Sequence, residues 1–79
     1  MLRIRLREAM EAYKMRTGDR LTYEKLAFES GISISTLQSM AARPGYNTRL
    51  STVEKLCVAL GCNPGDLLEL SSNSDEAVR

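Results

Sequence analysis

The spacing of apolar residues changes early in this 79-residue chain. Apolar residues first alternate with arginines, at Leu2, Ile4 and Leu6. They then recur at helical spacing, at Leu6, Met10 and Tyr13. The change of period predicts a short extended arm over residues 2–5 and a helix over residues 6–16. We expect Gly18 to end this helix, because glycine accepts the left-handed conformation that closes a helix C-terminus.

Two short helices with only two residues between them are predicted next. Each follows a residue whose side chain can cap a helix N-terminus, Thr22 for the first and Ser33 for the second. The apolar residue before each cap has a second one five positions later, the spacing of a hydrophobic staple, as in Leu21 with Leu26 and Ile32 with Leu37. Gly31 ends the first of these helices, and Pro44 ends the second after about Arg43.

A fourth helix is predicted after a loop over residues 46–50. Ser51 and Glu54 have capping-box spacing at its start, and Gly61 closes it. Its apolar face consists of Val53, Leu56, Cys57 and Leu60. We also expect three methionines to fill the core or lie near it, namely Met10, Met15 and Met40.

A short fifth helix follows. Asn63 can cap it, and Pro64 occupies its first position, where the missing N–H costs nothing. The helix is expected to run to about residue 70, with the extended arm lying beside residues 68–70. Residues 71–79 hold too little apolar surface to offset the entropy of ordering, so we expect a disordered tail.

Residues 21–40 carry the most informative pattern. A helix-turn-helix needs a small residue where its helices touch, a glycine in the turn, and three apolar residues that hold the second helix on the first. The chain supplies these as Ala27, Gly31, Ile32, Leu37 and Met40. With both caps they predict a helix-turn-helix over about residues 22–43. An ordinary pair of packed helices in a bundle is the alternative interpretation.

These features resemble the Cro and phage-repressor-like (XRE-type) helix-turn-helix family over about residues 5–70. The run Cys-Asn-Pro-Gly-Asp-Leu-Leu-Glu at residues 62–69 is similar to the closing pattern of a short-form group in that family. The resemblance implies an all-α, five-helix, lambda-repressor-like domain over residues 1–70 with a short N-terminal arm. It also implies a small transcriptional regulator, a repressor, that binds double-stranded DNA as a homodimer with its third helix in the major groove.

The resemblance further implies which residues touch DNA. Base edges are assigned to Ile34, Ser35 and Ser39, with Thr36 and Gln38 beside them. Phosphates are assigned to Thr22, Tyr23, Arg43, Asn47, Thr48 and Arg49. For both arginines the alternative is a solvated surface charge, and for the tyrosine it is a partly buried ring. An isoleucine offers only apolar contact to a thymine methyl and a serine only single hydrogen bonds, so we expect shallow sequence discrimination.

The net charge of +1 hides an asymmetry. Residues 1–50 carry nine Lys or Arg against five Asp or Glu, whereas residues 51–79 carry two against five. The basic half permits phosphate binding but does not by itself argue for it. This modest charge and the apolar Ile34 favour a second hypothesis, a protein-interaction module or antitoxin component on the same scaffold.

No catalytic, metal or cofactor site is predicted. The chain has no histidine, and Cys57 and Cys62 lack the Cys-x-x-Cys spacing of zinc and redox sites. Packing explains both cysteines, and a thiol sensor is the alternative. Reduced thiols, together with the lack of a signal-peptide run or a membrane-length apolar stretch, favour a cytoplasmic protein. Without a histidine base or a Gly-rich phosphate loop, we do not expect an enzyme.

Overall fold

Five helices and one pair of short strands make up the computed structural model, which describes residues 1–43 and 45–70. In chain order the elements are β1 (Leu2–Ile4), α1 (Leu6–Thr17), α2 (Tyr23–Ser30), α3 (Ile34–Ala42), α4 (Leu50–Leu60), α5 (Pro64–Leu67) and β2 (Leu68–Leu70). The predicted five-helix fold with an N-terminal extended arm is therefore confirmed. Pro44, predicted to end a helix, and the predicted disordered tail lie outside the described residues.

Side-chain caps start α2 and α3, as the sequence predicts. The Thr22 hydroxyl accepts a hydrogen bond from the Lys25 N–H at 3.1 Å, and the Ser33 hydroxyl accepts one from the Thr36 N–H at 3.2 Å. α2 ends at Gly31, whose φ of 76° lies in the left-handed region. Local hydrogen bonds and one glycine therefore define both helix starts and the turn between the two helices.

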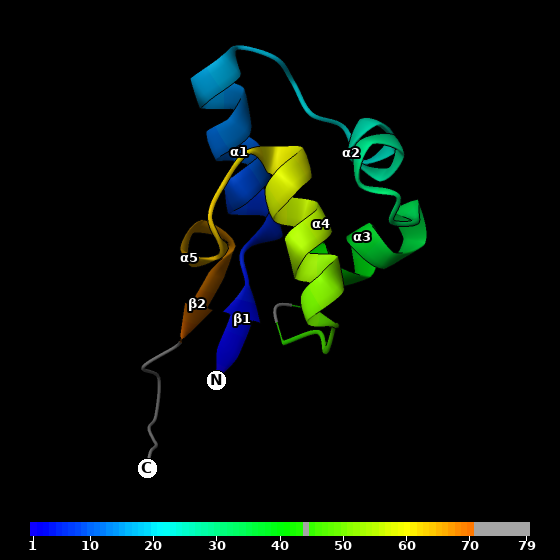
Figure 1. Ribbon diagram of the computed structural model, residues 1–79, viewed down its shortest axis with the longest axis vertical. Coiled ribbons are helices and arrows are strands. Elements are labelled where there is room, and N and C mark those ends of the chain that lie inside the picture. The colour runs from blue at the N-terminus through cyan, green and yellow to red at the C-terminus, as the bar shows by residue number, and fades with distance from the viewer. Residues whose placement is uncertain (44, 71–79) are drawn as a thin grey trace.

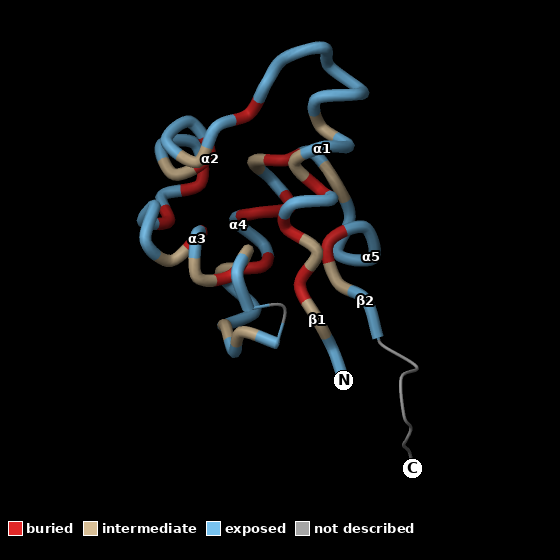
Figure 2. Tube along the Cα trace, turned by 180° about the vertical axis from the view of Figure 1, so that it is seen from behind, coloured by how far each residue is buried: buried red, intermediate tan, exposed pale blue. Residues whose placement is uncertain are grey.

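Helix α4 lies at the centre of the molecule (Figure 1). α2 and α3 lie on one side of it, and α1, α5 and the two strands lie on the other, as the reverse view in Figure 2 also shows. Every helix contributes to one core, whose most deeply buried side chains are Leu6, Leu26, Leu37, Met40, Leu56, Leu60 and Leu67. Met10 packs against this core, whereas Met15 is exposed, contrary to prediction. Five residues separate the two, which places Met15 on a different face of α1 from Met10.

The predicted start of α4 is wrong. The helix begins at Leu50, and its N-cap is Arg49, which makes no side-chain capping bond. Ser51 therefore lies inside the first turn and forms no capping box with Glu54. The Arg49 carbonyl instead accepts the first backbone bond of the helix, from the Thr52 N–H at 3.1 Å. The first-turn amides of α4 consequently have no side-chain cap.

The final three described residues form a strand and not the end of α5. Helix α5 stops at Leu67, and β2 pairs antiparallel with β1, with Arg3 opposite Glu69. The guanidinium and carboxylate of this pair lie 2.9 Å apart. The expected position of the arm beside residues 68–70 is confirmed, whereas the expected helix over those residues is corrected. Pairing with a distant strand draws the chain into the extended conformation there.

A side chain from α1 also reaches α4. The Arg16 guanidinium donates a hydrogen bond to the Leu60 carbonyl at 2.6 Å and lies 5.6 Å from the centre of the Tyr13 ring. The last carbonyls of a helix lack intrahelical partners and carry partial negative charge, so a cation there is favourable. This bond fixes α1 against α4 outside the apolar core.

We expect Gly31→Val to lower the free energy of unfolding by about 2 kcal/mol, because a β-branched residue is strained at positive φ. A Cβ at Gly31 would meet no atom within 4 Å, so the cost is conformational and not steric. Gly65→Val is the matched control, since that site is equally open and has no positive φ. Urea unfolding of the three proteins measures the difference, and equal losses in both variants would contradict the proposed role of the turn.

Candidate nucleic-acid interface

The turn between α2 and α3 is held from inside the molecule. The buried Ser30 hydroxyl donates to the Leu26 carbonyl at 2.6 Å and accepts from the Ile32 N–H at 3.3 Å. Ile32 is itself buried, and so are Leu37 and Met40 on the inner face of α3. One face of α3 is therefore fixed against the core, and the opposite face is left for other contacts.

The outer face of α3 is short, polar and open at its N-terminal end. Ser35 and Gln38 are exposed, and Ile34 is 36% exposed. Ser39 is half-buried, as is Thr36, whose hydroxyl accepts a hydrogen bond from the Ser33 hydroxyl at 2.9 Å. The helix thus carries the three residues predicted to face bases and the two predicted beside them, but Thr36 is partly engaged in the helix cap.

An aromatic residue that the sequence analysis did not single out orders the loop after α3. The Arg43 guanidinium lies 5.1 Å from the centre of the Tyr46 ring, and the Tyr46 N–H donates to the Arg43 carbonyl at 2.8 Å. Tyr46 also packs against the core. Arg43 is therefore exposed yet held by an anchored ring, which goes beyond the solvated surface charge considered as its alternative.

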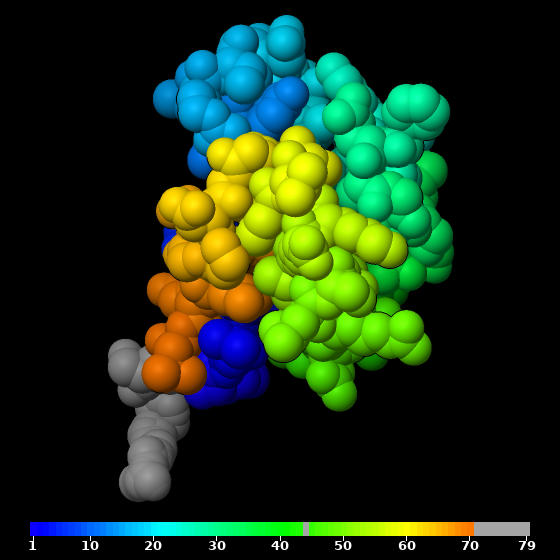
Figure 3. All heavy atoms as spheres, viewed as in Figure 1, coloured from blue at the N-terminus to red at the C-terminus, as the bar shows by residue number. Residues whose placement is uncertain are grey.

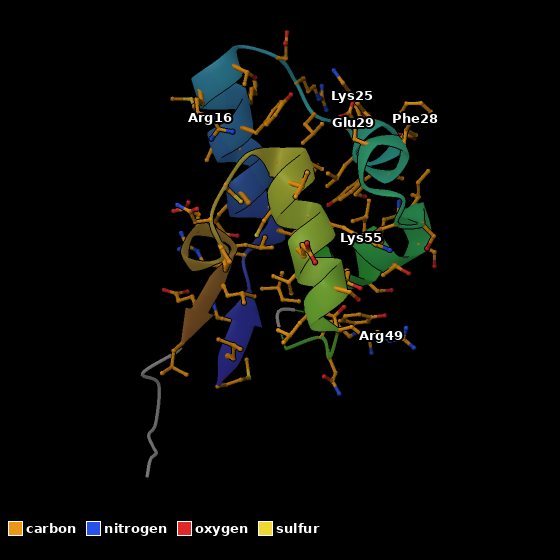
Figure 4. All side chains as sticks on the ribbon, in the orientation of Figure 1. Arg16, Lys25, Phe28, Glu29, Arg49 and Lys55 are labelled. Carbon is orange, nitrogen blue, oxygen red and sulfur yellow. The ribbon has the colours of Figure 1, made fainter. Side chains whose placement is uncertain are left out.

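The rest of this loop leads to the uncapped start of α4. Asn47 and Arg49 are exposed, and Thr48 is half-buried. In Figure 4 the Arg49 side chain points away from the body of the molecule, at the end of α4 that is nearest this loop. These three predicted phosphate-binding residues therefore precede a helix N-terminus with free amides.

The two predicted phosphate contacts at the start of α2 differ in character. The hydroxyl oxygen of Thr22 already accepts the capping bond from the Lys25 N–H. The hydroxyl can still donate its own proton to a phosphate oxygen. Tyr23 is half-buried and packs against the core. The ring is thus partly buried, which was the alternative to a phosphate contact for this residue. Only its exposed part is available to a ligand.

Three cations that the sequence analysis left out surround the same helix start. A hollow of about 570 Å³ between α1 and the start of α2 is lined by Arg7, Lys14 and Arg20, with Glu11 and Glu24 as its acidic members. No ion pair joins any of these cations to another described residue. The sequence held one signal, since Arg7 and Lys14 are seven positions apart and therefore share a face of α1.

Two short helices joined through a left-handed glycine, with the second exposing a polar face, define a helix-turn-helix DNA-binding domain. Residues 5–73 match the family of Cro/C1-type HTH DNA-binding domains, and the chain belongs to this family. It is 36% identical over 56 residues to a Bacillus subtilis (strain 168) protein named "Uncharacterized HTH-type transcriptional regulator YozG", across 71% of this chain and 67% of that protein. No solved structure matches the chain.

These findings confirm the family resemblance seen in the sequence, and with it DNA binding and a place among transcriptional regulators. That family is not an enzyme class. Within residues 1–43 and 45–70, no group of three or more His, Cys, Asp or Glu side chains is placed to hold a metal ion. Among the same residues, no helix combines the length and apolarity needed to cross a membrane.

The two cysteines are neighbours, Cys57 near the end of α4 and Cys62 in the link between α4 and α5. Cys57 is buried, and Cys62, which is half-buried, donates its N–H to the Cys57 carbonyl at 3.0 Å. Burial raises the pKa of the Cys62 thiol to about 11, helped by the neighbouring Cys57 thiol and by Asp66 and opposed by Arg16. The thiol is therefore protonated and weakly nucleophilic at neutral pH, which opposes the thiol-sensor alternative.

We expect this raised pKa to make stability fall at high pH. Between pH 9.0 and about 11 the unfolded thiol loses its proton while the folded one keeps it. The unfolded state then binds fewer protons, so the free energy of unfolding decreases as pH rises. Cys62→Ala is the control, because it removes this thiol and leaves every other ionisable side chain in place. Urea unfolding from pH 8 to 11 should show a steeper decline for the parent, and parallel curves would contradict the prediction.

Proposed function

We propose that this protein is a sequence-specific transcriptional repressor that binds double-stranded DNA in the cytoplasm as a homodimer. The observation that carries the proposal is the two-sidedness of α3, which buries Leu37 and Met40 and exposes Ser35 and Gln38. An α-helix with one free polar face fits the width of the major groove. A domain seated there represses by occupying DNA that polymerase would otherwise use.

Phosphate contacts in this proposal flank α3 on two sides. Arg43, Asn47, Thr48 and Arg49 lie after its C-terminus, beside the uncapped start of α4. Thr22 and Tyr23 lie on the other side, at the start of α2, where the cationic hollow adds Arg7, Lys14 and Arg20. Phosphate contacts on both flanks would hold α3 in register with the groove without reading sequence.

Base reading in this proposal depends on Ile34, Ser35, Gln38 and Ser39, with Thr36 supporting the helix start. None of the four has a charged side chain that binds guanine bidentately. Gln38 is the one that can form a bidentate pair, with adenine, and Ile34 provides an apolar surface for a thymine methyl group. We therefore propose a half-site rich in A·T pairs.

Protein binding is the second candidate function, and one observation favours it. Phe28 is 87% exposed on α2, pointing away from the core, and Figure 4 shows it at the margin of the molecule. Aromatic side chains, phenylalanine among them, are enriched in protein–protein interfaces. The salt dependence of DNA binding, described next, separates this candidate from the first.

We expect Arg49→Ala to weaken binding to all DNA sequences alike and to reduce the salt slope by about one unit, because one phosphate contact and its released counterion are lost. Lys55→Ala is the matched control. It removes the same charge from an exposed position on α4 that the proposal places outside the interface. Fluorescence anisotropy with random-sequence duplex at several salt concentrations measures the slopes.

An equal slope for the parent and Arg49→Ala would remove Arg49 from the interface. Binding by the parent that is weak and independent of salt would contradict the whole proposal and leave protein binding as the better candidate.

We expect Ile34 to detect the methyl group of a thymine. Sites selected from a random DNA pool give the sequence, and uracil is then substituted for each thymine in turn, which removes only the methyl. At one position of each half-site the parent should lose about fourfold in affinity, the equivalent of one buried methyl group at about 0.8 kcal/mol.

The Ile34→Ala variant should lose that discrimination, while Ser35→Ala should keep it. Stability of both variants should match that of the parent, because the outer face of α3 contributes little to the core. Equal binding of thymine and uracil sites by the parent would overturn the proposed role of Ile34.

A further inference from the structure

The ribbon formed by β1 and β2 carries an apolar face that the core covers at one end only. Leu2 lies opposite Leu70, and Ile4 lies opposite Leu68, so all four side chains share one face of the ribbon. Ile4 is buried and Leu68 half-buried, whereas Leu2 is 58% and Leu70 is 76% exposed. The apolar surface of the core thus continues along the ribbon into solvent.

The outer edge of β2 also has unused backbone groups. The Arg5 N–H donates to the Leu67 carbonyl at 2.7 Å, and the alternation of an antiparallel ladder then turns the peptide groups of Leu68 and Leu70 away from β1. The Leu68 N–H bonds to the Pro64 carbonyl. The Leu68 carbonyl and the Leu70 N–H therefore have no backbone partner among the described residues.

This edge lies on the outside of the molecule. In Figures 1 and 2 β1 stands between β2 and α4, so β2 is the outer strand in both views. The space-filling view shows β1 and β2 side by side at the margin. The ribbon and the helix-turn-helix lie on opposite sides of α4, so a partner on the ribbon leaves α3 free.

We infer that β2 is the dimerisation strand of this protein and that its partner is β2 of a second copy. Two β2 strands joined antiparallel about a two-fold axis at Glu69 form a four-stranded sheet in the order β1, β2, β2, β1. Each Leu70 N–H then donates to the Leu68 carbonyl of the other copy. The inference deepens the proposed function, because reading two half-sites requires a dimer.

Three features favour a second copy over another kind of partner. The edge is self-complementary, since the same two backbone groups serve as donor and acceptor on each side of the axis. The apolar faces become continuous, with Leu70 of each copy beside Leu68 of the other. The axis places the two Glu69 carboxylates opposite each other, and the Arg3 guanidinium 2.9 Å from each carboxylate offsets their repulsion.

Two three-residue edges bury much less surface than a stable protein interface, so we expect a weak, concentration-dependent dimer. Sedimentation equilibrium of the full chain without DNA tests this directly. The average mass should rise from 8.8 kDa towards twice that value as concentration increases from about 10 µM to about 1 mM.

Leu70→Pro should abolish the rise, because proline removes the N–H that bridges the two copies and no bond within the chain. Leu50→Pro is the matched control. It makes the same change in another exposed leucine, at the first position of α4, where proline is tolerated. This control should dimerise like the parent. Leu70→Lys, which places a charge on the apolar face, serves as a second variant, and thermal unfolding shows that each variant is folded.

A parent that stays at 8.8 kDa throughout, or a folded Leu70→Pro or Leu70→Lys variant that dimerises like the parent, would overturn the inference. The sedimentation samples contain no DNA. Failure to dimerise therefore removes the homodimer from the proposed function but leaves DNA binding by the single domain standing, and loss of DNA binding leaves this inference standing.

Discussion

Burial of side chains from every helix in a shared core, from one on α5 to four on α4, is the constraint on which the rest of this structure depends. α2 and α3 have eight and nine residues, and isolated helices of that length are marginal in water. They persist because Leu26, Leu37 and Met40 are buried against the rest of the core. The core therefore decides which side of α3 faces solvent, and that exposed side is the face proposed to read DNA.

Features that depend on residues close in sequence were predicted well. The caps at Thr22 and Ser33 and the left-handed Gly31 each rest on hydrogen bonds that span five residues or fewer, so the chain specifies them locally. The start of α4 was missed although it is also local. Ser51 has a side chain that can cap a helix. The helix begins one residue earlier, however, because the Arg49 carbonyl accepts the first helical hydrogen bond.

Features that join distant parts of the chain were harder to predict. Leu68 and Leu70 follow a helix and favour one by propensity, and only pairing with β1 makes them a strand. The contact of Arg43 with Tyr46 depends on a loop conformation that apolar spacing does not encode. The cationic hollow appears only when α1 and the start of α2 are brought together, since neither element alone encloses it.

The proposed phosphate contacts come from two separate groups of cations. The cations of the hollow sit partly on α1, which is tied to α4 through the bond from Arg16 to the Leu60 carbonyl. Arg49 sits at the opposite end of α4. The two groups of proposed phosphate ligands are thus held at the two ends of one packed pair of helices. Little ordering of the backbone would then accompany binding, which favours affinity.

The pairing of β1 with β2 also sets an order of events during synthesis. β1 is made first, but its partner strand emerges from the ribosome only after all five helices. Helical contacts over short stretches form sooner than contacts that close a long loop. The nascent chain therefore carries Ile4 without its partner strand until the ribbon closes. Slower translation before Leu68 then lengthens the time for which Ile4 lacks its partner strand.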